Sequence, residues 1–143
     1  MFSAKHSPLL KTGKIGELAA IQYLKDRHYK IIATNYWKPW GEIDIIAESK
    51  DATIVFVEVK AGEYKSENAA KIAAFSPEDH MNKRKIKNLK KVCQEFANKN
   101  SHLINEEKNW QIDLITVKII QNSELTEEKK NYIIKHYPNI VSF

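Results

Sequence analysis

The chain has 143 residues, 43% of them hydrophobic and 29% charged, with a formal net charge of +5. This length fits one domain with its own core, and the composition excludes a disordered chain. The single cysteine, Cys93, excludes an internal disulfide or a cysteine-cluster zinc site. The sequence has neither a membrane-length apolar run nor an apolar signal-peptide core near its start. We therefore expect a soluble cytoplasmic protein whose positive charge favours polyanionic partners.

The first predicted elements are a flexible lead, a helix, a strand and a turn. Residues 1–12 are expected to form the lead, and residues 13–143 a single folded domain. Gly13–His28 is predicted to be a helix, and its stretch Leu18–Leu24 is apolar nearly all round, which suggests that the helix is well buried. Tyr29–Asn35 is predicted to be a strand, and Tyr36–Gly41, with Pro39 and Gly41 as breakers, an aromatic-rich turn.

A hairpin, a loop, a helix and a further strand are predicted next. Glu42–Glu48 and Ile54–Lys60 are β-branched runs joined by a short polar loop, which indicates a hairpin. Ala61–His80 has weak periodicity and is predicted to be a mobile loop with a short helical piece at most. Met81–Asn98 has apolar residues at helical spacing and predicts an amphipathic helix, and Gln111–Ile120 predicts a strand.

The end of the chain is predicted to add a helix over Thr126–His136, which stops before Pro138. Asn139–Phe143 is expected to add a short edge strand. Helices mixed with strands in this order predict an α/β fold, with a mixed central sheet flanked by helices.

Two acidic residues stand inside apolar strands. Asp44 lies between Ile43 and Ile45, and Glu58 lies between Val57 and Val59. Side chains alternate along a strand, so Lys60 shares a face with Glu58. Asp44 can join that face only if the turn has an odd number of residues, Ser49–Thr53, or if a β-bulge separates the two carboxylates.

Two facing carboxylates repel each other unless a cation lies between them. Mg²⁺ is the natural occupant, with Mn²⁺ as a possible substitute, because it binds one or two carboxylates and shares its other positions with water and phosphate. Asp44 and Glu58 are therefore the predicted metal ligands, and Lys60 is predicted to orient water or stabilise developing charge. The alternative is a structural ion pair with Lys60, although such pairs seldom repay their desolvation.

The segments Gly41–Ala47 and Phe56–Lys60 resemble the YraN family of small bacterial proteins, as do Gly13–Ala20 and Gln111–Ile115. Further points of resemblance are Asn35, Trp37, Phe75–Pro77 and the basic helix. The resemblance implies a restriction-endonuclease-like PD-(D/E)xK core, similar to archaeal Holliday junction resolvases. It also implies that Asp44 and Glu58 bind metal, that Lys60 is the catalytic lysine and that Glu17 completes the site. One departure is Ala61-Gly62, where the family usually carries a polar or basic pair.

Three other groups have competing interpretations. Glu17 without the resemblance is a helix-end acid stabilised by the helix dipole. Asp113 repeats the pattern of an acid in an apolar strand, and a role in holding Lys60 or a backbone amide is favoured over metal ligation. The five histidines show no paired metal-ligand spacing, and only His80 lies near a functional segment.

A run of cations without an intervening acid predicts phosphate binding, with a solvated helix face as the alternative. The run contains Lys83, Arg84, Lys85, Lys87, Lys90 and Lys91. Upstream, Lys38 lies among three aromatic residues that either stack on unpaired bases or close the edge of the core, namely Tyr36, Trp37 and Trp40.

These patterns together predict a Mg²⁺-dependent endonuclease acting on DNA. Branched or damaged DNA is suggested by fold analogy alone. A homodimer is compatible with paired cuts, although no residue demonstrates one. Two alternatives remain: a non-catalytic nucleic-acid-binding module with the same fold, and a scaffold protein whose acidic residues are structural.

Overall fold

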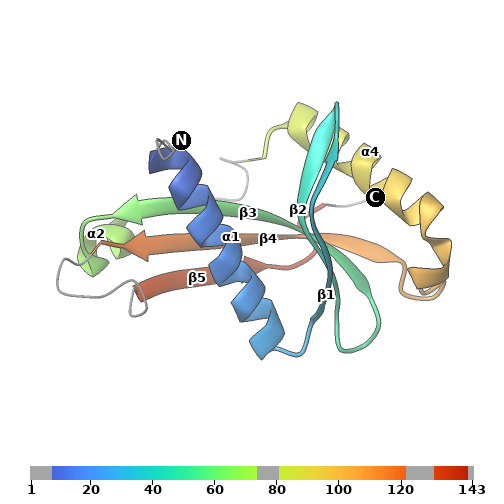
Figure 1. The fold of residues 1–143 in the computed structure, drawn as a ribbon, viewed down its shortest axis with the longest axis horizontal. Helices are drawn as coiled ribbons and strands as arrows, with labels where there is room; N and C mark the ends of the chain where they lie inside the picture. Colours follow the sequence, from blue (N-terminus) through green and yellow to red (C-terminus); the bar gives the residue numbers. More distant parts are fainter. Residues whose placement is uncertain (1–7, 74–80, 122–130, 142–143) are drawn as a thin grey trace, which may run out of the picture.

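The fold is an α/β arrangement around one five-stranded mixed sheet with strand order β1-β2-β3-β4-β5 (Figure 1). The computed structural model describes residues 8–73, 81–121 and 131–141. Strands β3 and β4 are parallel, and the other neighbouring pairs are antiparallel. The elements are α1 (Pro8–Asp26), β1 (Lys30–Lys38), β2 (Gly41–Glu48), β3 (Ile54–Tyr64), α2 (Glu67–Ile72), α4 (Lys83–Lys99), η1 (Ser101–Leu103), β4 (Trp110–Ile120) and β5 (Asn131–Tyr137). The predicted fold class, a mixed sheet flanked by helices, is confirmed.

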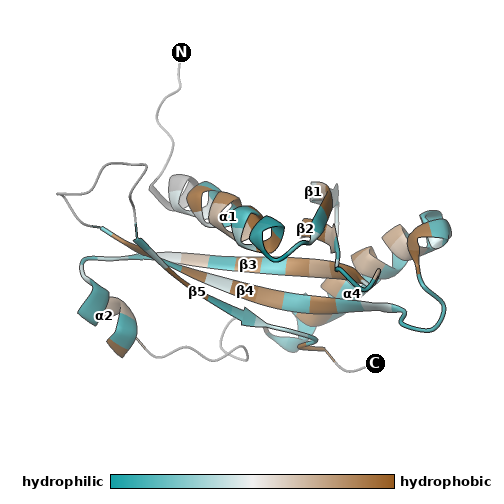
Figure 2. Ribbon diagram, turned by 90° about the horizontal axis from the view of Figure 1, so that it is seen from below, coloured by the Kyte–Doolittle hydropathy of each residue, from teal (hydrophilic) through white to brown (hydrophobic). Residues whose placement is uncertain are grey.

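The sheet has a hydrophobic core on each face. On one face, α1 packs against alternate residues of the central strands, including Ile45, Val57 and Ile115. On the other face, α4 packs against their neighbours, including Ile46 and Phe56. Figure 2 shows α1 and α2 on opposite sides of the β3–β4 part of the sheet. Within the described ranges, no helix combines the length and the apolar character needed to cross a membrane.

The sheet forks between β2 and β3. Strand β3 pairs with β4 along its whole length, from Ile54↔Trp110 to Tyr64↔Ile120. Its pairing with β2 covers only the stretch from Glu48↔Ile54 to Ile45↔Val57. Beyond that point the β1–β2 hairpin rises away from the rest of the sheet (Figure 1). Backbone groups of β3 beyond Val57 therefore face a gap on the side of β2.

The turn between β2 and β3 is the odd-length one of the two predicted alternatives. Ile46 faces Phe56, so the turn contains the five residues Ser49–Thr53. The Ser49 N–H donates to the Thr53 carbonyl at 2.9 Å and closes the turn. This register puts Asp44 level with Glu58 without a bulge in the paired stretch.

Several predicted boundaries of the first half are wrong. Helix α1 already begins at Pro8, inside the predicted lead, of which residues 1–7 lie outside the described residues. Strand β1 continues to Lys38, so Tyr36 lies on a strand rather than in a turn. The reason is tertiary, because Tyr36 pairs with Ile43 and its ring packs edge-on against Phe96.

The predicted loop over 61–80 is also partly wrong. Its first residues continue β3 to Tyr64, because β4 offers a paired edge over that whole length. The short helical piece is confirmed as α2, whose first turn is capped by the Ser66 hydroxyl accepting from the Ala69 N–H at 3.0 Å. Residues 74–80, including His80, lie outside the described residues.

The predicted last helix is wrong where it can be compared. Asn131–Tyr137 forms β5, which pairs with β4 from Leu114↔Tyr137 to Ile120↔Asn131. The free edge of β4 thus decides a segment whose local composition favours a helix. Residues 122–130 and 142–143 lie outside the described residues, and residues 138–141 form no strand.

Candidate active site

The candidate site lies in the fork between β2 and β3, where Asp44 bridges the two strands. Asp44 lies one residue beyond Ile45↔Val57, where the pairing of β2 with β3 ends. Its Oδ2 accepts a hydrogen bond from the Val59 N–H at 2.8 Å. The Asp44 carboxylate therefore takes the place of a β2 carbonyl as the acceptor for the Val59 N–H. The fork holds Asp44 half-buried beside β3.

Glu58 and Lys60 lie together in this fork, as their alternation along β3 predicts. Glu58 is only 8% exposed, and its Oε1 lies 3.8 Å from the Lys60 Nζ. A second cation also reaches it, since the Lys85 Nζ of α4 lies 3.5 Å from the same oxygen. The sequence placed Lys85 in the basic run but gave no sign that it approaches Glu58.

The local electrostatics leave Asp44 short of positive charge. Burial and the neighbouring charge of Glu58 raise the pKa of Asp44 from 3.8 to about 7, with smaller contributions from Glu42 and Glu17. The hydrogen bond from Val59 acts in the opposite direction. Asp44 therefore exchanges its proton near neutral pH.

Burial also lowers the pKa of Lys60, and the adjacent amine of Lys85 lowers it further. Glu58 and Asp44 oppose that shift. The lysine is thus held where losing its proton is easier than it is in water.

Asn35 of β1 connects Glu17 of α1 to Glu42 of β2 by two hydrogen bonds. The Asn35 Nδ2 donates to the Glu17 Oε2 at 3.1 Å and to the Glu42 Oε1 at 3.0 Å. Asn35 adopts a φ of 53°, a left-handed conformation that asparagine tolerates better than most residues. Asn35 therefore links Glu17 to Glu42, and the charges of both acids contribute to raising the pKa of Asp44. The structure also adds Glu42 and Asn35, whose only sequence signal was their place in the motif.

The position of Glu17 depends on a close helix–strand approach. A Cβ on the preceding Gly16 would overlap the Cβ of Ala61 on β3. Only a residue without a side chain lets α1 lie this near to the strand. Gly16 thereby lets α1 lie close enough to the sheet for Glu17 to bond to Asn35.

The carboxylates fit a hard divalent cation. Asp44 and Glu58 offer oxygen ligands from facing strands, and the raised pKa of Asp44 reflects its burial together with repulsion from Glu58, which a cation would relieve. Among the described residues, no group of three or more His, Cys, Asp or Glu side chains has the arrangement of a metal cage. A two-carboxylate set suits Mg²⁺, which binds proteins through one or two carboxylates and retains several waters.

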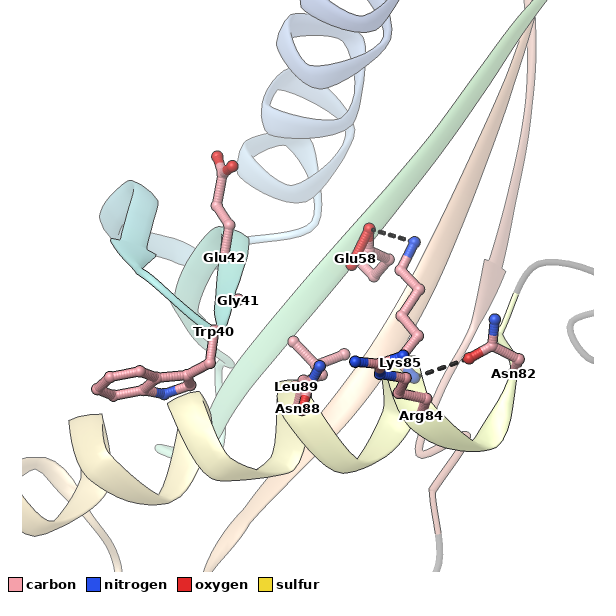
Figure 3. Close-up of a pocket in the computed structure, with 9 residues that line it drawn as sticks. All are labelled: Trp40, Gly41, Glu42, Glu58, Asn82, Arg84, Lys85, Asn88 and Leu89. Carbon is pink, nitrogen blue, oxygen red and sulfur yellow. Dashed lines mark hydrogen bonds and ion pairs between the residues drawn. The ribbon is translucent and has the colours of Figure 1, made fainter.

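A pocket of about 290 Å³ adjoins Glu58 between the tip of the β1–β2 hairpin and α4 (Figure 3). Its lining combines an aromatic residue, two cations, two acids and two amides: Trp40, Gly41, Glu42, Glu58, Asn82, Arg84, Lys85, Asn88 and Leu89. Asn82 caps α4, since its Oδ1 accepts from the Lys85 N–H at 2.8 Å. The cap fixes the first turn of α4, from which Lys85 extends to Glu58 (Figure 3).

The predicted phosphate-binding residues occupy two sides of α4. Arg84 faces the pocket beside Glu58. A larger groove of about 810 Å³ runs along the other side of the helix, and its basic lining residues are Lys83, Lys87, Lys90 and Lys91. Lys38 lies apart from them at the end of β1, with its Nζ 5.4 Å from the centre of the Tyr36 ring.

Asp113 does not join the fork. It is fully buried on β4 at the level of Val57, where its carboxylate meets His136 of β5 at 2.6 Å. It also accepts from the Gln111 Nε2 and the Asn139 N–H, each at 2.8 Å. These bonds tie the end of the chain to the sheet, in line with the role in holding a backbone amide. The contact with His136 was not predicted from the sequence, because His136 was expected to lie at the end of a helix rather than on β5.

Comparison with known proteins gives the family. The model of Uncharacterised protein family UPF0102 matches residues 16–117. This chain belongs to the UPF0102 family. The UPF0102 protein of Alkaliphilus oremlandii is 36% identical over 129 residues, 90% of this chain and 96% of its own length. Those of Fervidobacterium nodosum and Acetivibrio thermocellus are also 36% identical, and cover 91% and 87% of this chain and 81% and 88% of their own lengths.

UPF0102 is the YraN family, so the resemblance noted from the sequence is confirmed. The UPF0102 match extends from Gly16 to Val117. It therefore contains the fork, the pocket and all of α4, and it ends before β5.

Proposed function

We propose that this chain is a Mg²⁺-dependent endonuclease that hydrolyses phosphodiester bonds of DNA. One observation carries the proposal: Asp44 is half-buried beside the buried Glu58, and burial together with the negative charge of Glu58 raises the pKa of Asp44 to about 7. A carboxylate pair kept only for stability would be expected to have its charge neutralised within the protein. Incomplete neutralisation supports a ligand that brings positive charge.

The chemistry follows from the residues of the fork. Asp44 and Glu58 would hold the cation, which when bound stabilises negative charge on phosphate oxygens and acidifies a bound water. Lys60, 3.8 Å from Glu58, can hold or move a proton at its Nζ because its pKa is lowered. Glu17, which accepts a hydrogen bond from Asn35, adds its own negative charge near Asp44 and so would strengthen the attraction for a cation.

The basic face of α4 supports DNA as the polymer. Arg84 and Lys85 lie at the pocket next to Glu58, and further lysines line the groove along the helix. Cations at this spacing suit phosphates of a nucleic-acid backbone, and their contribution falls as salt rises. Lys38 at the hairpin end extends the same sign of charge. Branched or damaged DNA is the more specific proposal and rests on analogy of fold.

Cleavage of labelled substrates with Mg²⁺, Mn²⁺ or EDTA tests the proposal. The panel contains linear duplex, single strand, flap and four-way junction DNA, together with RNA of the same sequences. Glu58→Gln keeps the size of the side chain and removes its charge, and it should lower the rate at least about 100-fold, since loss of a supporting group around a metal already costs about 10–100-fold. Glu67→Gln is the matched control, because Glu67 is an exposed acid on α2 that pairs with Lys71 at 3.0 Å.

The outcomes separate the candidates. Metal-dependent cutting that is lost in a folded Glu58→Gln protein and kept in Glu67→Gln supports the endonuclease. Cutting that survives in Glu58→Gln contradicts the proposed site. Salt-sensitive DNA binding without cutting of any substrate would favour the non-catalytic binding module, and circular dichroism confirms folding in each case.

A further inference from the structure

We infer that the pocket between the hairpin tip and α4 binds a single unstacked nucleotide of the substrate, next to the bond that is cut. The inference rests on the proposed function and deepens it, because it names the feature of the nucleic acid that is recognised. Figure 3 shows Trp40 at one end of the pocket and Glu58 with Lys85 further along it. An aromatic end and a cationic end are what a base and its phosphate require.

Trp40 supplies a stacking surface. Trp40 is 38% exposed and lines the pocket, so part of its indole is accessible to a ligand. The Lys91 Nζ lies 4.8 Å from the centre of the indole and holds the ring by a cation–π contact. Any base can stack on an exposed aromatic ring, because every base has a π-face.

The pocket is built by packing of two elements. A Cβ on Gly41 would lie 3.1 Å from the Val92 Cγ2, so the start of β2 rests directly on α4. Because Trp40 immediately precedes Gly41, this contact fixes the indole relative to the helix. The pocket wall is therefore held in place before any ligand binds.

The opposite end of the pocket suits a phosphate. Arg84 and Lys85 are consecutive on α4 and both line the cavity. The Lys85 Nζ is also 3.5 Å from the Glu58 Oε1, so a phosphate at Lys85 lies beside the carboxylate proposed to hold the cation. A nucleotide with its base on Trp40 would thus place its own phosphate beside Glu58 and the proposed cation.

Size and polar groups agree with one nucleotide. The cavity volume of about 290 Å³ lies near the lower end of the range of about 300–1,000 Å³ for small-molecule pockets, so it does not accept a stacked run of bases. Asn88 and Asn82 carry amide groups of the type that bonds to base edges. Asn82 is already fixed by its cap on Lys85, which leaves Asn88 as the more adaptable of the two.

The test compares three metal-free DNA ligands in EDTA: a perfect duplex, the same duplex with one bulged nucleotide, and a duplex whose bulge lacks only its base. The full-length protein should bind the bulge about tenfold more tightly than the other two. Trp40→Ala should lose this preference, and Trp40→Phe should restore most of it. Trp37→Ala is the matched control, because Trp37 is 65% exposed on the same hairpin, lies outside the lining and should leave the preference intact.

Cleavage of the perfect duplex in Mg²⁺, measured in parallel, separates this inference from the proposed function. Equal binding of the bulge and the baseless bulge overturns the inference, even if the duplex is cut as proposed. A preference that persists in Trp40→Ala overturns it as well. Failure to bind any of the three ligands overturns both the inference and the proposed DNA-binding function.

Discussion

Two acidic residues of the sheet have the same local sequence and opposite surroundings. Asp44 and Asp113 each stand between two large apolar residues of a strand. Asp113 is fully buried and has three hydrogen-bonding partners within 2.8 Å, from Gln111, His136 and Asn139. Both of its carboxylate oxygens are therefore hydrogen-bonded inside the protein.

Among the residues that the structure describes, Asp44 has one hydrogen-bonding partner and a neighbouring acid that repels it. Its hydrogen bond comes from the Val59 N–H, and Glu58 acts against its ionisation. An acid in an apolar strand therefore does not by itself indicate a ligand site. What distinguishes a structural acid from a candidate ligand is the number of donors around it and the sign of the nearest charge.

The largest expected effect is the loss of stability in Asp113→Ala. Removing this carboxylate leaves His136 and the Asn139 N–H without their buried acceptor, so the free energy of unfolding should fall by about 3 kcal/mol or more. Urea denaturation followed by circular dichroism measures it. The same experiment on Asp113→Asn should give a smaller loss, because the amide keeps an acceptor oxygen. A loss below about 1 kcal/mol in the alanine variant would remove the contrast with Asp44.

Asp44→Asn should raise the free energy of unfolding of the metal-free protein at alkaline pH, whereas Asp113→Ala should lower it. The pKa of Asp44 in the folded chain, about 7, is above its ordinary value of 3.8, so the folded state binds this proton more tightly than the unfolded chain. The resulting stabilisation is complete below about pH 4 and is lost as the pH rises through 7. The shift sets an upper bound of about 4 kcal/mol, and partial exposure reduces the expected change to about 1–2 kcal/mol.

Urea denaturation in EDTA at pH 5 and pH 8 compares wild type with Asp44→Asn. The variant should be the more stable protein at pH 8, and its advantage should shrink at pH 5. Asp26→Asn, an exposed acid at the end of α1, controls for removing one negative charge. An advantage of Asp44→Asn that does not depend on pH would show that Asp44 is as well satisfied as Asp113.

The smallest expected effect concerns the cations of the fork. Lys85→Met removes a positive neighbour that lowers the pKa of Lys60, so this pKa should rise. The pH dependence of Lys60 acylation, followed by mass spectrometry, reports it. Lys83→Met, which removes an exposed lysine from the same turn of α4, should leave the profile of Lys60 unchanged.

Much of the fork could be predicted because strand alternation is a rigid rule. Requiring Asp44 and Glu58 on one face left two alternatives, an odd-length turn or a β-bulge, and the observed pairs Ile46↔Phe56 and Glu48↔Ile54 select the odd-length turn. The amphipathic pattern of α4 was also sufficient, because its buried residues recur at helical spacing.

What the sequence could not supply depends on long-range contacts. The chain around His136 was predicted to be helical, and only the free edge of β4 makes it a strand. Lys85 is one cation among six in its run, and its approach to Glu58 depends on where α4 crosses the fork. Neither local propensity nor spacing contains that information.

The contact between Gly16 and Ala61 limits how this sequence can change over generations. The two positions share one space, so a side chain added at 16 would have to be matched by the loss of the methyl group at 61 or by a displaced helix. A displaced helix would carry Glu17 away from Asn35. Substitutions at positions 16 and 61 should therefore covary among related sequences, so that a relative with alanine at 16 carries glycine at 61.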